Sequence, residues 1–296
     1  MLPPEIAKEL AYLEISASRR IRSLRFGQSR SRIRGSGYEF ESHYKYQIGE
    51  DLRRVDWNVS ARMQDLFLKR NYEEKEVVVF IVADVSRSMR YSTAEYSKRM
   101  RMVQVAASLA FSATEDNCHL GFMAFSDKVE AYEPPRKGKG HVWRVIDRLY
   151  GMERSNTGTN WETALRFLRS RLNRMSIIFL LSDFVASPDT KDLPDIPDFK
   201  AIARRHDIVP IIFEDQLETK LPTGHGLLRF RSAEGKGEMT LSLSSKQRDQ
   251  YEAIVERRKQ GLRDLFFSLG LECMFLPVSE PFMDPLMELF ERRKKV

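Results

Sequence analysis

The chain has 296 residues, of which 49 are basic and 42 acidic, so its formal net charge at pH 7 is +7. Its length suits one large α/β domain with an appendage, or two small domains, and its 42% hydrophobic content allows a sizeable core. The mild positive charge permits a nucleic-acid partner without requiring one. The two cysteines provide neither a disulfide framework nor a zinc-binding spacing, and residues 1–15 lack the apolar core of a signal peptide.

The first part of the chain predicts an N-terminal helical and extended appendage. Apolar residues at helical spacing predict a helix from residue 3 to about residue 26. An arginine-rich stretch begins at Arg19 and ends at Arg34, with seven arginines and no acid. Residues 35–72 then mix aromatic and charged side chains, with short strand-like pieces such as DLFLKRNY at 65–72.

From residue 76 onward, apolar strands alternate with amphipathic helices. The run EVVVFIVAD at 76–84 is continuously apolar, as expected of a central strand covered on both faces. The further strands are expected over 119–127, 129–135, 175–184, 207–215 and 271–278, and the helices over 97–116, 141–152, 161–172, 198–206, 246–269 and from 281. A β-hairpin insertion is expected around 216–245. This alternation predicts an α/β fold with a doubly wound, mainly parallel sheet.

Three oxygen-rich loops follow the strands or precede the helices of this predicted sheet. Ligands bind beyond the carboxyl ends of strands in open α/β sheets, so we expect the three loops to lie close together. Their carboxylates and hydroxyls belong to Asp84, Ser86, Ser88, Thr157 or Thr159, and Asp183. Such donors suit a hard divalent cation, above all Mg²⁺. Two carboxylates would balance the charge of one Mg²⁺, and a vacant position could then take a carboxylate from another protein.

This pattern resembles the metal-ion-dependent adhesion site of von Willebrand factor A domains. In that family Asp-x-Ser-x-Ser follows a buried strand, a threonine lies in a later loop, and an aspartate follows a further strand. The resemblance implies a von Willebrand A-like domain over 76–296 and the following ligands for Mg²⁺ or Mn²⁺: Asp84, Ser86, Ser88, Thr159 and Asp183. It favours Thr159 over Thr157 because the family's threonine usually follows a glycine.

A longer resemblance covers residues 34–215. The segment GSGYEFESHYKYQIGEDLRRVDWNVSAR resembles the signature of the bacterial family called domain of unknown function 58. The matching residues are Gly35, Gly37, Glu39, Phe40, Gly49, Asp51, Arg53, Asp56, Trp57, Ala61 and Arg62, and the departures are Glu50 for an aspartate and Tyr44 for an arginine. The resemblance implies that residues 1–75 form a family-specific segment packed on the main domain. We expect Trp57 in that packing, and a buried ion-pair network among Asp51, Arg53, Arg54, Asp56 and Arg62. A partner-binding surface and a catalytic site are the alternatives for this segment.

The two resemblances imply a non-enzymatic, Mg²⁺-dependent protein-interaction module in the cytoplasm, with no membrane span. Genes of the second family commonly lie beside a MoxR-type AAA+ ATPase, so the implied role is an adaptor for that chaperone system. The partner would offer an acidic side chain to the metal.

Two alternatives remain open. One is a nucleic-acid-binding protein that uses residues 19–34. The other is a metal-dependent hydrolase. The hydrolase is disfavoured because Ser86 stands where a dehalogenase-like phosphatase has its second aspartate, and because no histidine forms a recognisable pattern with a serine.

Overall fold

The computed structural model describes residues 3–20, 39–72, 77–152, 158–185, 193, 196–224, 226–231 and 238–294. The chain divides into two compact units: a sheet unit, formed by residues 1–26 with 77–296, and a small unit, formed by residues 27–76. Residues 1–26 therefore group with the sheet unit, which divides the segment 1–75 that we expected as one piece. The packing of residues 35–72 on the sheet unit stays a prediction.

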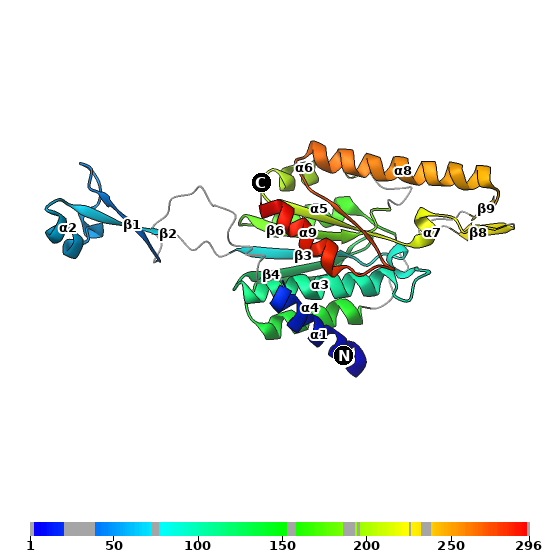
Figure 1. Cartoon of the computed structure of the whole chain (residues 1–296), viewed down its shortest axis with the longest axis horizontal. Helices are drawn as coiled ribbons and strands as arrows, with labels where there is room; N and C mark the ends of the chain where they lie inside the picture. Colours follow the sequence, from blue (N-terminus) through cyan, green and yellow to red (C-terminus); the bar gives the residue numbers. More distant parts are fainter. Residues whose placement is uncertain are drawn as a thin grey trace. The chain divides into compact units, whose positions relative to one another are not determined.

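The sheet unit contains a six-stranded sheet in the order β10-β7-β6-β3-β4-β5, of which Figure 1 labels β6, β3 and β4. Its strands are β3 (Val78–Asp84), β4 (His119–Phe125), β5 (Val129–Arg136), β6 (Ser176–Ser182), β7 (Asp207–Glu214) and β10 (Met274–Pro277). All neighbouring pairs are parallel except β4 and β5, which are antiparallel. The predicted α/β fold with a mainly parallel sheet is confirmed, and β3 lies near its middle.

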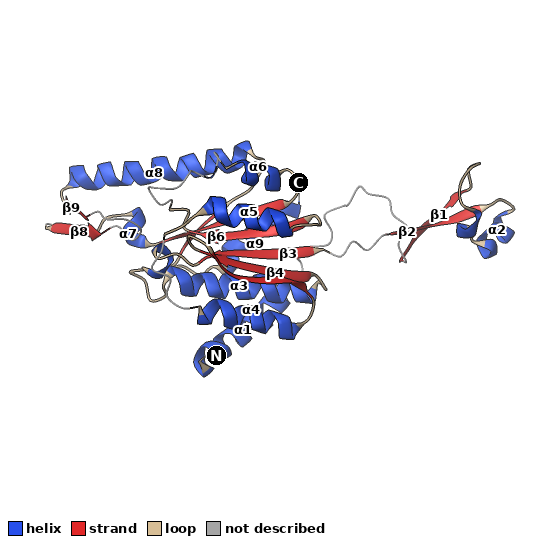
Figure 2. Cartoon of the chain, turned by 180° about the vertical axis from the view of Figure 1, so that it is seen from behind, coloured by secondary structure: helices blue, strands red, loops and turns tan. Residues whose placement is uncertain are grey.

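Helices cover both faces of this sheet (Figures 1 and 2). One face carries α1 (Pro4–Arg20), α3 (Lys98–Glu115), α4 (Lys139–Gly151) and α9 (Met283–Lys294), and the other carries α5 (Trp161–Arg171), α6 (Pro197–Ala203) and α8 (Ser245–Ser268). Alternate residues of β3 enter the two cores: Val79, Ile81 and Ala83 on the first face, and Val78, Phe80 and Val82 on the second. Burial on both faces explains why β3 is apolar from Val78 to Ala83.

An insertion follows β7, as the sequence predicted. It consists of α7 (Gln216–Thr219) and the antiparallel hairpin of β8 (Leu227–Arg231) and β9 (Glu238–Ser242); with the separately predicted helix α8 that follows, we call these elements the arm. The short helix α7 was not predicted. The rings of Phe230 and Tyr251 stack with their centroids 6.0 Å apart, which fastens the hairpin to α8. Figure 1 shows the hairpin beside the end of α8 where that helix begins.

The small unit contains β1 (Glu39–Lys45) paired antiparallel with β2 (Phe67–Tyr72), together with the 3₁₀ helix η3 (Leu52–Arg54) and α2 (Trp57–Met63). The predicted strand at 65–72 is thereby confirmed, whereas β1 and α2 were not predicted.

The structure describes only part of the ion-pair network expected in the small unit, because the side chain of Arg54 lies outside the described residues. Asp51 caps η3, and Asp56 caps α2 while its other carboxylate oxygen lies 2.8 Å from His43 Nε2. Arg53 and Arg62 are exposed. Trp57 is also 65% exposed, so its ring is not part of a core within this unit.

In the part of the chain that the structure describes, no helix combines the length and the apolar character needed to cross a membrane. The arginine side chains of residues 19–34, on which the nucleic-acid alternative depends, lie outside the described residues.

The close contact between β3 and β4 gives a test of the sheet. A Cβ added at Gly121 of β4 would lie 2.4 Å from the ring of Phe80, which is fully buried. We predict that Gly121→Ala lowers the free energy of unfolding by about 1–3 kcal/mol, because the well-packed ring must move. Urea denaturation measures this.

The matched control for that substitution is Gly140→Ala in α4. A Cβ at Gly140 would meet nothing within 4 Å, so the control should be neutral or stabilising by up to about 1 kcal/mol. Equal stability of the Gly121 variant and the wild type would contradict the β3–β4 packing.

Candidate functional site

The carboxylate of Asp84 joins three loops at the end of the central strand. Asp84 is the last residue of β3 and is fully buried. Its Oδ1 accepts a hydrogen bond of 2.9 Å from the backbone N–H of Ser86. Its Oδ2 accepts hydrogen bonds from the hydroxyls of Ser182, at 2.6 Å, and Thr159, at 3.5 Å. The three loops predicted from the sequence therefore meet at one carboxylate.

The first loop brings two serine hydroxyls together. The backbone N–H of Val85 donates to the carbonyl of Phe125 at 2.8 Å, which continues the β3–β4 ladder one residue beyond Asp84. The chain then turns into the 3₁₀ helix η4 (Ser88–Arg90). The hydroxyl oxygens of Ser86 and Ser88 lie 3.1 Å apart, and both side chains are buried. The Asp-x-Ser-x-Ser spacing thus places its three oxygen-bearing side chains in one short turn.

The second loop is held by the start of α5. Asn160 is the N-cap of this helix, and its side chain accepts from the backbone N–H of Thr163. The backbone N–H of Asn160 also donates to the carbonyl of Ser126, at the end of β4. Thr159, directly before this cap, is 1% exposed and faces Asp84. Its rival Thr157 lies outside the described residues.

The third loop contains a strained residue beside the site. The hydroxyl of Ser182 accepts from the backbone N–H of Phe184, in addition to its bond with Asp84. Phe184 has φ of 52°, a left-handed conformation that is unfavourable for an aromatic residue. Its ring stacks on Trp161 with centroids 5.1 Å apart and an interplanar angle of 12°. Packing therefore holds the turn that follows Asp183.

Asp183 contacts a buried lysine that the sequence gave no reason to select. The Nζ atom of Lys98, the first residue of α3, lies 2.7 Å from Asp183 Oδ2 and 2.6 Å from Oε1 of Glu218 in α7. The other oxygen of Asp183 accepts from the backbone N–H of Val185 at 3.1 Å. Lys98 is fully buried although it lies in the first turn of a helix, a position that is usually solvated.

Asp215 extends this cluster to the loop before α3. Its carboxylate accepts hydrogen bonds of 2.7–2.8 Å from the hydroxyls of Ser92 and Thr93 and from the backbone N–H of Thr93. Burial alone would raise the pKa of Asp215, but these hydrogen bonds outweigh it and lower that pKa. Asp215 and Glu218 also form the capping box of α7. The start of the arm is thereby fixed to the site.

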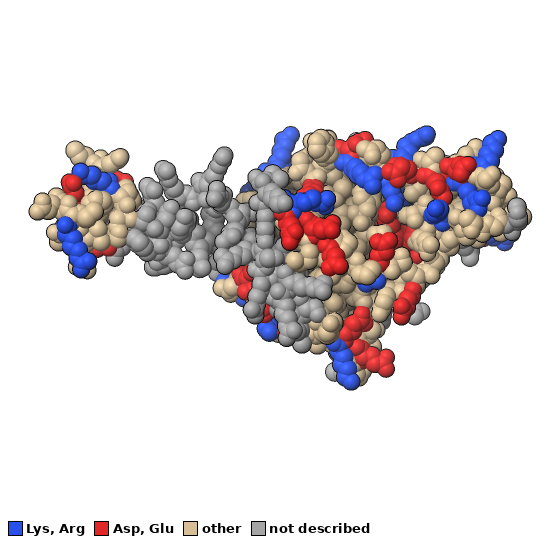
Figure 3. All heavy atoms as spheres, viewed as in Figure 1, with Lys and Arg blue, Asp and Glu red and all other residues tan. Residues whose placement is uncertain are grey.

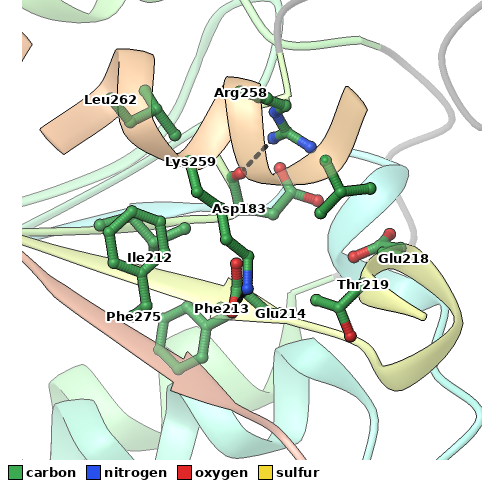
Figure 4. Close-up of a pocket in the computed structure, with 11 residues that line it drawn as sticks. Asp183, Ile212, Phe213, Glu214, Glu218, Thr219, Arg258, Lys259, Leu262 and Phe275 are labelled. Carbon is green, nitrogen blue, oxygen red and sulfur yellow. Dashed lines mark hydrogen bonds and ion pairs between the residues drawn. The ribbon is translucent and has the colours of Figure 1, made fainter. Parts of the chain in front are cut away.

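A small cavity lies beside Asp183, between β7 and α8 (Figure 4). The guanidinium of Arg258 in α8 donates a 2.9 Å hydrogen bond to the backbone carbonyl of Asp183, the dashed line of Figure 4. Lys259 forms an ion pair of 2.8 Å with Glu214, and its ammonium lies 5.9 Å from the centroid of the Phe275 ring. Side chains of α8 therefore close one side of the third loop.

The electrostatics of the site favour a cation. Burial, and after it the charge of Asp183, raise the pKa of Asp84 to about 7 from 3.8, although hydrogen bonds from Ser182 and Ser86 act in the opposite direction. Negative charge at Asp84 is thus poorly compensated by the protein alone. A divalent cation among the loops would supply the missing positive charge.

The candidate ligand atoms are all oxygens, the type of donor that Mg²⁺ and Mn²⁺ prefer. The five predicted ligands, Asp84, Ser86, Ser88, Thr159 and Asp183, are each at most 3% exposed. Among the described residues, no three His, Cys, Asp or Glu side chains gather into a metal cluster, so a site here depends on hydroxyls in addition to its two carboxylates. Such an all-oxygen set is typical of hard cations.

A model of the family described as "Protein of unknown function DUF58" matches residues 42–261. The chain belongs to this family. Uncharacterized proteins of Mycobacterium tuberculosis and Mycobacterium bovis are 24% identical to it over 294 residues, which cover 99% of this chain and 91% of theirs. The sheet unit has the α/β architecture that the sequence predicted for a von Willebrand A-like domain.

Solved structures with partial likeness include von Willebrand A domains. A conserved hypothetical protein BatB from Bacteroides thetaiotaomicron matches 74% of this chain and 100% of its own, at 14% identity and a TM-score of 0.45. The VWA domain of SpRpn10 matches 74% of this chain and 95% of its own, at 11% identity and a TM-score of 0.40. Proximal thread matrix protein 1 from the mussel byssus, with a zinc-occupied MIDAS motif, matches 47% of this chain and 38% of its own, at 18% identity and a TM-score of 0.36.

The raised pKa of Asp84 predicts a distinct pH dependence of stability in EDTA. The folded state holds the Asp84 proton up to a pH of about 7, whereas the unfolded chain releases it near 3.8. This group therefore stabilises the fold below pH 3.8, and its contribution is lost as the pH rises toward about 7. Between pH 3.8 and about 7, the thermal midpoint of the wild type should fall more than the thermal midpoint of Asp84→Asn. Parallel curves for the two proteins would contradict the buried, poorly compensated carboxylate.

Proposed function

We propose that the sheet unit is a Mg²⁺-dependent protein-interaction module and has no catalytic role. The observation that carries this proposal is the convergence of three loops on the buried carboxylate of Asp84. In this proposal the carboxylates of Asp84 and Asp183 and the hydroxyls of Ser86, Ser88 and Thr159 hold the ion. A bound Mg²⁺ would supply an electrophilic centre for an oxygen ligand from another molecule.

The environment of the serines supports an interaction role over hydrolysis. A serine nucleophile needs a base within hydrogen-bond reach, usually a histidine. The hydroxyl partner of Ser86 is instead the hydroxyl of Ser88. Among the described histidines, His141 bonds the carbonyl of Leu120 and His43 bonds Asp56, so both have partners in the fold away from the serines.

The charge around the loops supports an acidic partner. Two carboxylates balance one Mg²⁺, and Lys98 adds a positive charge next to Asp183. Arg87 and Arg90 lie in the first loop and are partly exposed, and Tyr91 beside them is 53% exposed. A carboxylate that approaches the first loop would thus meet positive charge, which speeds association through steering.

The partner we propose is a MoxR-type AAA+ ATPase or its client, with this chain as the adaptor of the pair. The family resemblance supports this choice, and the chemistry of the site requires only that the partner offer an acidic side chain. A nucleic-acid partner would need a continuous basic patch. Figure 3 instead shows basic and acidic side chains intermingled on the described part of the face in view.

The test is the affinity of the wild-type chain for the ATPase, measured by calorimetry in Mg²⁺ and then in EDTA. We expect removal of the metal to weaken binding at least about tenfold, as loss of one buried charge-assisted contact would. Asp84→Ala should bind equally weakly in both conditions. If the ATPase does not bind in Mg²⁺, affinity capture with the wild type and Asp84→Ala identifies the partner for the same measurement.

Two serine variants distinguish an effect on the proposed metal site from an effect on folding stability. Ser86→Ala removes a proposed ligand, whereas Ser108→Ala removes an equally buried hydroxyl that bonds the carbonyl of Gln104 within α3. Partner affinity should fall in the first variant and stay unchanged in the second. Equal affinity of the wild type in Mg²⁺ and EDTA would reduce the metal to a structural role.

A further inference from the structure

Lys98 presents a permanent cation to one of the proposed metal ligands. Its ammonium is fully buried between the carboxylates of Asp183 and Glu218. Carboxylate oxygens lie 2.7 Å and 2.6 Å from Nζ, and two opposite charges at such distances favour the protonated amine. The side chain therefore stays charged. A buried charge of this kind is tolerated only because both partners are in place.

The position of the ammonium is held from two sides. The hydroxyl of Ser97, the N-cap of α3, accepts from the backbone N–H of Met100 and so fixes the helix start at Lys98. The second carboxylate oxygen of Glu218 accepts from the backbone N–H of Asp215 at 3.3 Å, which anchors Glu218 in α7. Neither end of the Lys98–Glu218 pair is a loose surface side chain.

The charge of the cluster depends on this lysine. With Asp84, Asp183 and Glu218 ionised and Lys98 protonated, the four side chains carry a net charge of −2, and without Lys98 the charge is −3. The ammonium also competes directly with a metal ion for Asp183 Oδ2, because its hydrogen bond to that oxygen is 2.7 Å long. Removing the ammonium would therefore make the donor set more attractive to a divalent cation.

We propose that Lys98 is a positioning residue of the metal site that limits how much negative charge the protein gives the ion. This inference rests on the proposed function. By weakening the hold of Asp183 on the ion, Lys98 leaves part of the metal's charge to be balanced by a partner's carboxylate. Glu218 tunes this effect because it shares the same ammonium.

The two neighbours of Asp183 should act in opposite directions. Lys98→Met removes the competing cation and should tighten metal binding. Glu218→Gln leaves the ammonium with Asp183 as its one charged partner and should weaken metal binding. A purely structural role predicts something else: both substitutions loosen the site, so both weaken metal binding or leave it unchanged.

Calorimetric titration with Mn²⁺ alone measures these affinities. We expect Lys98→Met to bind Mn²⁺ at least about tenfold more tightly than the wild type and Glu218→Gln at least about tenfold more weakly, the range found for groups that contact metal ligands. The matched control is Glu214→Gln, which removes a carboxylate that pairs with Lys259 at 2.8 Å instead of with Lys98. Its affinity should stay within about threefold of the wild type, because this substitution leaves the Lys98 ammonium and both of its carboxylate partners in place.

Lys98→Met leaves Asp183 and Glu218 without their cation and could unfold the protein for that reason. A second pair of variants tests the inference in that event. Glu218→Gln and the double variant Lys98→Met/Glu218→Gln differ by the lysine alone, and the double variant has one carboxylate fewer than Lys98→Met to leave without its cation. The double variant should bind Mn²⁺ more tightly than Glu218→Gln. Its thermal midpoint should also rise more on addition of Mn²⁺, because tighter binding gives a larger stabilisation.

The outcomes separate this inference from the proposed function. If the wild type binds Mn²⁺ but removing Lys98 leaves the affinity unchanged or lower in both backgrounds, the inference is wrong and the metal site stands. If the wild type binds no Mn²⁺ but the variants without Lys98 do, the inference holds and metal dependence of the natural chain fails. If none of the proteins binds Mn²⁺, both are wrong.

Discussion

A carboxylate at the end of the central strand must be compensated inside the protein, and the arrangement of the site follows from this constraint. Asp84 is fully buried, so its charge is costly unless donors or a cation face it. The hydroxyls of Thr159 and Ser182 and the N–H of Ser86 draw three separate loops to this one group. The strained turn at Phe184 and its stacking on Trp161 keep the third loop in that position.

Much of this site follows from sequence because parallel strands end at a common edge. The apolar runs that became β3 and β6 are unambiguous, so Asp84 at the end of β3 and Asp183 directly after β6 were predictable neighbours. The place of the second loop before a helix was predictable, and the family resemblance favoured Thr159 over Thr157 within it. The remainder depended on tertiary contacts. A lysine after a serine N-cap is ordinarily solvated, and the burial of Lys98 depends on α7, whose four residues show no periodicity.

The structure of the small unit was harder to predict from sequence than the candidate site. Its family signature is long, yet its charged residues serve local purposes: Asp51 and Asp56 cap short helices, and Arg62 is exposed. Capping satisfies a carboxylate without a buried cation, a role that the mixture of acids and arginines in the sequence did not indicate. The strand β1 is as long as β3, but its sequence EFESHYK has no apolar run, and α2 is too short for helical periodicity to reveal it.

The central claim is that the three loops hold one divalent cation, and a crystal of the wild-type chain grown with Mn²⁺ tests it most directly. The account predicts a single anomalous difference peak at about 2.1–2.3 Å from oxygens of Asp84 and the loop hydroxyls, the distance expected for such an ion. Lys98 should still contact Glu218 in that crystal. A site without anomalous density, with the Lys98 ammonium as the nearest cation to Asp84 and Asp183, would contradict the account.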